Sequence, residues 1–303
     1  MPLLWEFPQI FSGRRTSTLK ELRFTAELDR PVTLREFLRG EKGVSQRLLA
    51  KLKRTENGLT RNGRPVTAAD LIENGDVIVL RRPDDSFLEP NSALKIPVVY
   101  ESEAVAVFDK PAGVPVHPSQ GHRTDTLGNL CAYLYPELTF RPIDRLDRDT
   151  SGLVAVAKDP YCARQLQGSL EKTYIAAVCG RTEPEGVICA PIGRAPGSVI
   201  LRCVREDGRP AVTRYRKIAE SSAYTLEEIR LETGRTHQIR VHFSHIGCPL
   251  AGDGLYGGGC GQIRRQALHC GELRFREPLT GEEVSVRSEL PLDIRALFPE
   301  EKL

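Results

Sequence analysis

The sequence predicts an α+β fold with a mixed, mostly antiparallel β-sheet, preceded by a small basic α/β lobe. In residues 98–303, short strand-like segments predominate and helical segments occur singly between them, a pattern typical of α+β domains. Residues 153–157 are apolar without alternation, which predicts a strand buried on both faces. The chain has 303 residues, more than a single small domain usually contains, so we expect two domains.

Positive charge is concentrated in the first of these domains. Residues 14–82 hold 16 Lys and Arg against 9 Asp and Glu, an excess of seven, while the whole chain carries a net charge of only +3. The remainder therefore carries −4. A basic lobe on a mildly acidic body indicates that the lobe meets a polyanion.

The sequence shows neither a membrane span nor a metal motif. No apolar run approaches the roughly 20 residues that cross a bilayer, and the first residues lack the basic start and apolar core of a secretory signal. We therefore expect a cytoplasmic protein. Eight cysteines are scattered singly without a C-x-x-C pair, whereas zinc sites show short paired spacings, so we expect no metal.

The first lobe, residues 14–82, is predicted to contain an edge strand at 19–24, two short helices and a hairpin. Thr33 and Glu36 fit a capping box at the start of the first helix. Asn62 and Gly63 supply the turn of the hairpin, and residues 76–80 add a strand. The second helix carries leucines on one face and a basic row on the other, consisting of Arg47, Lys51, Lys53 and Arg54.

Residues 83–97 are polar and aperiodic, and we expect them to be a linker. In the second domain, residues 98–303, three prolines and a glycine fix residues 109–118 as an ordered loop. Asp159 and Pro160 supply the cap and first position of a helix that ends near residue 167. The other expected elements are strands at 98–100, 104–108, 172–178 and 224–231, a helix at 126–135, and a final hairpin of 273–275 with 284–286.

Two further segments have clear local signals. Residues 206–209, Glu-Asp-Gly-Arg, predict a hairpin between strands at 199–205 and 211–218. Within residues 234–247, Ile239, Phe243 and Ile246 recur at helical spacing, and a glycine follows them, so this stretch predicts a helix.

The most charged stretch precedes the buried strand. Residues 141–149 pack three Asp and three Arg into nine positions, directly before the apolar run at 153–157. A charged loop held at the end of a buried strand is a place where a scaffold presents chemistry. A solvated charged turn is an equally natural interpretation of these residues alone.

Other chemistries are only weakly indicated. Neither glycine-rich nucleotide cradle, G-x-x-x-x-G-K-[ST] or G-x-G-x-x-G, opens a helix after a strand, and Ser151 lacks the G-x-S-x-G elbow of a hydrolase. A glycosidase would need two acids facing one bond. Asp144, Asp147 and Asp149 offer such pairs, but the neighbouring arginines could simply neutralise them.

Several motifs together resemble the RluA-type pseudouridine synthase family. They are residues 145–153 (Arg-Leu-Asp-Arg-Asp-Thr-Ser-Gly-Leu), 172–176 (Lys-Thr-Tyr-Ile-Ala), 234–242 (Gly-Arg-Thr-His-Gln-Ile-Arg-Val-His) and 110–113 (Lys-Pro-Ala-Gly). The resemblance runs from about residue 98 to 298 and implies the pseudouridine synthase fold. Residues 33–41, 44–54, 58–66 and 74–79 are similar to an S4 RNA-binding domain, whose basic row would contact RNA phosphates.

The family resemblance implies a role for each matching residue. Asp147 would be the nucleophile, attacking either C1′ or C6 of a uridine, a choice that the sequence leaves open. A guanidinium would keep it ionised and oriented, by the match Arg240, with Arg235 as the weaker claimant. Tyr174 would stack on the base and could assist proton removal at C5. Arg145 would fill the space that the flipped uridine leaves. No cofactor is implied.

One position departs from the family. It usually has His before Arg-Leu-Asp, and here that residue is Asp144, which puts carried-over target specificity in doubt. We expect a monomeric RNA pseudouridine synthase that acts on large-subunit, 23S-type ribosomal RNA. The alternatives are a tRNA pseudouridine synthase, a catalytically silent RNA-binding or ribosome-assembly factor and, more distantly, a glycosidase.

Overall fold

The computed structural model describes residues 20–44, 46–82, 88–259 and 261–299, with only the backbone of residues 20, 47 and 82. The chain divides into two units, Met1–Phe87 and Leu88–Leu303, each described here by itself. The division falls inside the stretch expected as a linker, 83–97. Ile96 of that stretch is buried, and the Asn91 amide donates to the Asn129 carbonyl at 3.0 Å, so its second part packs on the second unit. Residues 14–19 and 83–87, where we placed the first boundaries, lie outside the described residues.

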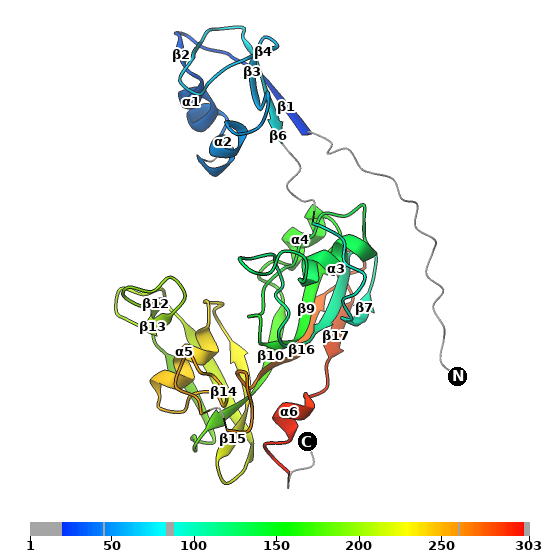
Figure 1. Cartoon of the computed structure of the whole chain (residues 1–303), viewed down its shortest axis with the longest axis vertical. Coiled ribbons are helices and arrows are strands. Elements are labelled where there is room, and N and C mark those ends of the chain that lie inside the picture. The colour runs from blue at the N-terminus through cyan, green and yellow to red at the C-terminus, as the bar shows by residue number, and fades with distance from the viewer. Residues whose placement is uncertain (1–19, 45, 83–87, 260, 300–303) are drawn as a thin grey trace, which may run out of the picture. The chain divides into compact units, whose positions relative to one another are not determined.

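In the described part of the first unit, four strands form a sheet of order β1-β6-β3-β4 (Figure 1). They are β1 Lys20–Thr25, β3 Leu59–Arg61, β4 Arg64–Pro65 and β6 Val77–Arg82, and a separate pair joins β2 Val32–Thr33 to β5 Leu71–Ile72. As predicted, β1 is an edge strand, and Asn62 and Gly63, with φ of 50° and 80°, turn β3 into β4.

Two short helical segments cover this small sheet. The capping box is confirmed, because the Thr33 hydroxyl accepts from the Glu36 amide at 3.2 Å and the Glu36 carboxylate accepts from the Thr33 amide at 2.9 Å. α1 Leu34–Glu36 then continues as a π-helical turn, Phe37–Glu41, and α2 spans Gln46–Leu52. Leu34, Phe37 and Leu38 are fully buried in the core of the unit, which explains their helical spacing.

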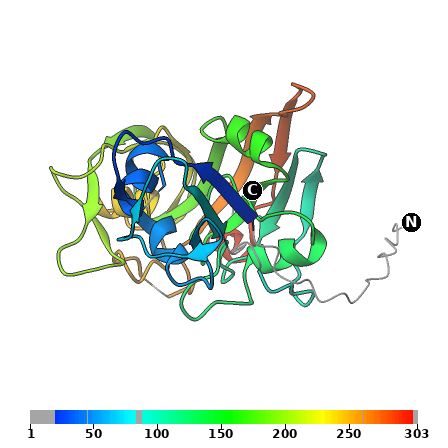
Figure 2. The ribbon, with the colours of Figure 1, turned by 90° about the horizontal axis from the view of Figure 1, so that it is seen from above.

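Within the described part of the second unit, nine strands form one sheet, mostly antiparallel, of order β11-β14-β15-β10-β16-β9-β8-β7, with β17 beside β16. Seen from above, the orange strands β16 and β17 and the teal β7 and β8 lie toward one end (Figure 2). The bounds of the nine strands are β7 Val98–Glu101, β8 Val105–Lys110, β9 Ser151–Ala157, β10 Glu171–Cys179, β11 Glu185–Cys189, β14 Val212–Glu220, β15 Tyr224–Leu231, β16 Leu268–Arg276 and β17 Glu283–Arg287.

Helices lie over both halves of this sheet, α3 Leu127–Leu134 and α4 Pro160–Leu166 over one and α5 Gln238–His245 over the other (Figure 1). Asp159 caps α4 as predicted, accepting from the amides of Tyr161 and Cys162 at 2.7 and 3.0 Å. A last short helix, α6 Leu292–Arg295, follows β17.

The predicted hairpin around residues 206–209 is wrong. Residues 205–208 do make a turn, since the Gly208 amide donates to the Arg205 carbonyl at 2.9 Å. However, β13 Arg202–Val204 pairs with β12 Ile192–Arg194, whereas β14 pairs with β11 and β15. A turn signal fixes only the local change of direction, and the partner of each flanking strand is decided by tertiary contacts.

The apolar run forms β9, and every residue of that strand is buried, as predicted. β9 begins in a parallel pairing with β16, Ser151 opposite His269 and Gly152 opposite Cys270. Gly152 has a φ of +108°, and a Cβ there would lie 2.3 Å from the Cys270 carbonyl oxygen. Only glycine allows the two backbones to approach so closely, so Gly152 fixes where the charged loop ends.

Candidate active site

The three aspartates of the charged loop have three different partners. Asp149 forms a two-bond pair with the adjacent Arg148, with distances of 3.0 and 2.9 Å. Asp144 forms an ion pair with Lys172 of β10. Asp147 is bound by Arg240 of α5 at 2.9 Å. The charged stretch is therefore more than a solvated turn, because two of its carboxylates reach elements far along the chain.

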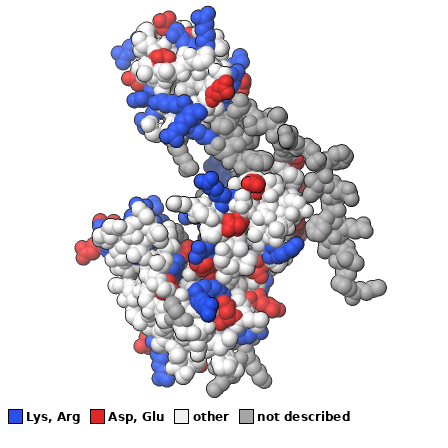
Figure 3. All heavy atoms as spheres, in the orientation of Figure 1, with Lys and Arg blue, Asp and Glu red and all other residues white. Residues whose placement is uncertain are grey.

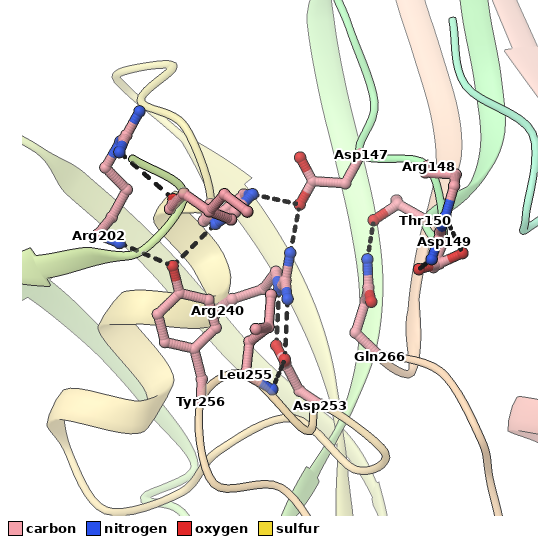
Figure 4. Close-up of polar contacts among 12 residues, drawn as sticks. Asp147, Arg148, Asp149, Thr150, Arg202, Arg240, Asp253, Leu255, Tyr256 and Gln266 are labelled. Atoms are coloured by element: carbon pink, nitrogen blue, oxygen red, sulfur yellow. Dashed lines mark hydrogen bonds and ion pairs between the residues drawn. The ribbon is translucent and has the colours of Figure 1, made fainter. Parts of the chain in front are cut away.

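Arg240 lies between Asp147 and a second carboxylate, Asp253 (Figure 4). Its Nε and Nη2 donate to Asp253 at 2.6 and 2.9 Å, and its Nη1 donates to Oδ2 of Asp147. The Arg240 side chain is 5% exposed and that of Asp253 1%, while Asp147 is 29% exposed. Burial opposes the charge, but the hydrogen bonds that Arg240 donates to both carboxylates raise the pKa of Arg240. The result is a fixed buried cation that presents one accessible carboxylate.

The start of α5 is anchored so that Arg240 reaches this position. The side-chain amide of Gln238 donates to the Val212 carbonyl at 3.0 Å and to the Thr213 hydroxyl at 3.1 Å, both on β14. Its oxygen accepts from the Arg235 amide at 3.0 Å. Because these bonds satisfy a buried amide, the first turn of α5 is held rigidly on the sheet.

Tyr174 lies on β10 and pairs with Cys270 of β16. The register between these two strands shifts between Thr173 and Tyr174. Tyr174 is 7% exposed. Burial, assisted by nearby Cys270 and Asp147, raises the pKa of Tyr174 well above its ordinary value. The phenol is therefore neutral, and it can stack or donate a hydrogen bond but is a poor base.

The two other arginines implied by the resemblance lie differently. Arg145 is exposed on the charged loop and acts electrostatically on His117. The expected alternative, a salt bridge of Arg145 to Asp144 or Asp149, is not what we find among the described residues, since those carboxylates pair with Lys172 and Arg148. Arg235 donates from Nε to the Pro210 carbonyl at 3.0 Å, so Arg240 is the arginine that meets Asp147.

The end of β8 and the loop that follows it hold the backbone of the charged loop. Lys110 is fully buried, and its ammonium donates to the carbonyls of Pro111 and Arg148 at 2.8 and 3.0 Å. The Gly113 amide donates to the same Arg148 carbonyl at 3.0 Å. Burial lowers the pKa of Lys110 to about 7. The lysine and glycine of the 110–113 motif thus fix the backbone one residue after Asp147.

Sequence reasoning missed three residues of this cluster: Asp253, His237 and Tyr256. His237 Nε2 lies 3.7 Å from Oδ2 of Asp147, and its Nδ1 is 2.8 Å from the Tyr256 hydroxyl. The Tyr256 ring lies under the Arg240 guanidinium at 5.0 Å. Asp253 and Tyr256 belong to a glycine-rich loop, residues 250–259, and an acid among glycines there was the only available signal.

The basic row of the first unit is partly described. Lys53 and Arg54 are exposed just after α2, whereas Lys51 is half-buried and has a partner. Arg47 lies in α2, but its side chain is outside the described part. Lys and Arg side chains spread over much of the visible face of this unit (Figure 3).

Among the described residues, no group of three or more His, Cys, Asp or Glu could hold a metal ion. Over the same residues, no helix combines the length and the apolar character that crossing a membrane requires.

Comparison with known proteins defines the class of the protein. A family model described as RNA pseudouridylate synthase matches residues 104–245. The RNA pseudouridine synthase YjbO of Bacillus subtilis (strain 168) is 39% identical over 279 residues, covering 88% of this chain and 98% of that protein. Ribosomal large subunit pseudouridine synthase D of Pseudomonas aeruginosa is 38% identical over 259 residues, covering 78% and 81%.

A solved structure agrees with these matches. Human RNA pseudouridylate synthase domain containing 1 has a TM-score of 0.55 and 28% sequence identity, covering 66% of this chain and 86% of that one. Fold and relatives together define an RNA-modifying isomerase. The chain belongs to the RluA/RluD-type family of RNA pseudouridine synthases, so its substrate is RNA and the expected fold class is confirmed.

Proposed function

We propose that this RNA pseudouridine synthase modifies large-subunit ribosomal RNA, with Asp147 as its nucleophile. The observation that carries the proposal is the Asp147–Arg240 pair, in which a buried arginine holds a carboxylate that remains 29% exposed. A nucleophile needs this combination of a fixed orientation and an open side. Relatives named ribosomal large subunit pseudouridine synthase D support the choice of RNA.

The chemistry requires only one such carboxylate. Isomerisation breaks the N1–C1′ bond of a uridine and forms a C5–C1′ bond, while C5 loses a proton and N1 of the product carries one. Substrate and product are isomers, so no oxidant or reductant is consumed. Asp147 would begin the reaction by attack at C1′ or at C6, and both routes use a carboxylate oxygen on the exposed side.

Two neighbours complete the proposed site. Tyr174, neutral and buried beside Asp147, would contact the face of the uracil and would not act as the base at C5. Arg145, exposed two residues before the nucleophile, would occupy the gap that the flipped nucleotide leaves, since unstacking costs a few kcal/mol.

We also propose roles for the remaining basic residues. Arg235, three residues before α5, would contact the substrate RNA near the site. The first unit, expected to be S4-like, would bind RNA backbone through Arg47, Lys51, Lys53 and Arg54, because such contacts position a nucleic acid without reading its sequence. We expect the protein to act as a monomer.

The test is a map of pseudouridines in total RNA from cells that lack this protein, complemented with wild type, Asp147→Asn or Asp149→Asn. Asp149 is a matched control, since it lies on the same loop but pairs with its neighbour Arg148. Wild type and Asp149→Asn should restore the same sites in large-subunit ribosomal RNA, and Asp147→Asn should restore none while it still binds RNA.

Each part of the proposal has its own contrary result. Restored sites confined to tRNA would refute the choice of ribosomal RNA. Full restoration by Asp147→Asn would refute the nucleophile. A wild type that binds ribosomal RNA and changes no uridine would favour the silent binding factor.

A further inference from the structure

His237 occupies a strained position next to the proposed nucleophile. It is the residue before α5, with φ of 58° and ψ of 21°, the left-handed conformation. This conformation costs a residue other than glycine about 1–2 kcal/mol, and such strain persists where the surroundings require a particular side-chain placement. Here the placement brings Nε2 to 3.7 Å from Oδ2 of Asp147.

The hydrogen-bond partners of His237 favour one of the two neutral tautomers of its ring. The Tyr256 hydroxyl accepts from the backbone amide of Arg202 at 3.1 Å. Its own proton is then free to be donated to Nδ1 of His237, 2.8 Å away. With Nδ1 accepting, the proton of a neutral imidazole is on Nε2, the nitrogen that faces the carboxylate.

The charge around His237 favours the same state. Burial lowers the pKa of His237, and the neighbouring cations Arg240 and Arg202 act in the same direction, against the opposite effect of Asp147 and Asp253. The ring is therefore neutral at pH 7. A carboxylate can only accept, so a neutral ring that faces it is favourable only as the Nε2–H tautomer.

We propose that His237 is a positioning residue for Asp147, acting as a neutral Nε2–H donor whose tautomer is set by the relay from the Arg202 amide through the Tyr256 hydroxyl. This inference rests on the proposed role of Asp147. At 3.7 Å the contact is longer than a hydrogen bond. Catalytic hydrogen bonds are often long in the free enzyme and shorten when substrate binds, so the bond forms in the RNA complex.

A hydrogen bond from His237 would also fix the orientation of the Asp147 carboxylate. Arg240 donates to Oδ2, and His237 faces the same oxygen. Among the described side chains, the donors that we find at Asp147 thus converge on Oδ2, and Oδ1 is left for the substrate. Two donors on one oxygen restrict rotation of the carboxylate in a way that Arg240 alone does not.

The test compares two amides at position 237. Asparagine tolerates the left-handed conformation but is too short to reach Asp147 from it, whereas glutamine places its amide nitrogen near the position of Nε2. Tyr256→Phe keeps the ring under Arg240 and removes the hydroxyl. Single-turnover rates are measured on total RNA from cells that lack the protein, over a range of enzyme concentrations, with Asp147→Asn in the same assay.

We expect His237→Asn to lower the rate constant at saturating enzyme by roughly 10- to 100-fold, with the half-saturating concentration unchanged. His237→Gln should stay within a few fold of wild type, and Tyr256→Phe should lose about 10-fold. A purely structural role would not separate Asn from Gln in this way, provided that both variants unfold at the wild-type temperature.

Equal rates for wild type and His237→Asn would overturn the proposal, as would a loss in His237→Gln as large as that in His237→Asn. If Asp147→Asn loses turnover while both His237 variants keep it, the inference alone fails. If Asp147→Asn keeps turnover, the proposed nucleophile fails, and the role of His237 fails with it.

Discussion

At the scale of the residue, the site depends on how buried charges are compensated. Arg240 and Asp253 form a two-bond pair with side chains 5% and 1% exposed. Arg265 and Asp293 form a pair of the same geometry, at 2.7 and 2.8 Å, in which Asp293 is 44% exposed. The two pairs differ in the burial of the carboxylate and in the other partners of the arginine, which are Asp147 for Arg240 and three backbone carbonyls for Arg265.

Asp253→Ala should lower the free energy of unfolding by about 3 kcal/mol, because it leaves the Arg240 charge buried with one partner fewer. Asp293→Ala should cost less, about 1 kcal/mol, because Asp293 is 44% exposed and Arg265 keeps its bonds to three backbone carbonyls. Urea unfolding of both variants measures the difference. Equal losses would show that Asp147 alone compensates Arg240.

Glu227 of β15 is a buried carboxyl group outside the site. It is fully buried, accepts a bond from the Thr182 hydroxyl, and its Oε2 has no partner among the described residues. Burial raises the pKa of Glu227 to about 7. Between its unfolded value of 4.5 and about 7, the folded protein therefore holds a proton that the unfolded chain has lost.

Stability should consequently fall as pH rises through this window, and the loss should be complete above pH 7. Glu227→Gln removes the titrating group while keeping the shape. We expect the variant to gain roughly 1–2 kcal/mol on wild type between pH 5 and pH 8, measured by urea unfolding at each pH. A constant difference across this range would mean that Glu227 is ionised in the folded state throughout.

Among the residues of the site, those in recognisable sequence motifs could be predicted, and those in the loop after α5 could not. Asp147, Tyr174 and Arg240 lie in recognisable motifs, and the structure places Arg240 on Asp147. Asp253 and Tyr256 meet Arg240 only after β10 and α5 have packed. Their loop has no spacing signal, since the contacts arise from tertiary structure. His237 lies inside the 234–242 motif, but its left-handed conformation before a helix has no mark in the sequence, so its approach to Asp147 could not be predicted.

At the scale of the element, the close approach of β9 and β16 restricts which residue can occupy position 152. Gly152→Ala should cost more than about 3 kcal/mol, because a Cβ at φ +108° would lie 2.3 Å from a backbone oxygen of Cys270. Gly234→Ala is the control, since a Cβ there meets nothing within 4 Å. Thermal unfolding compares them, and a Gly152→Ala protein as stable as the control would show that β16 can shift.

Elements with strong local signals were predicted well. The unbroken apolar run became β9, and Thr33, Asp159 and the Asn62–Gly63 pair acted as the caps and turn that the sequence indicated. Strand pairing was less predictable. β13 pairs with β12 rather than β14, because pairing depends on which edges the folded sheet leaves available.

At the scale of the whole molecule, charge is distributed unevenly between the two units. Lys53 and Arg54 are exposed just after α2, and in the proposed function they contact phosphates. Replacing both with Gln should weaken RNA binding uniformly across RNA sequences. It should also make the dependence of log K on log salt shallower by roughly 1.4–1.8.

The control is Arg30→Gln with Arg64→Gln, which removes the same charge from exposed positions of the same unit. Filter binding across a salt series measures both slopes. If the two double variants weaken binding and flatten the slope equally, the first unit attracts RNA by its net charge and not through the row after α2.

The position of β16 also has a consequence for synthesis. β16 joins β10 to β9 in the centre of the sheet, yet it comprises Leu268–Arg276 and is made long after both of its neighbours. While the ribosome is still making the chain, β9 and β10 are complete but have unpaired edges, and such edges invite association with other chains. The nascent protein is therefore most vulnerable to aggregation after β10 has been made and before β16 emerges, when Asp147 already exists but the sheet that supports it is still open.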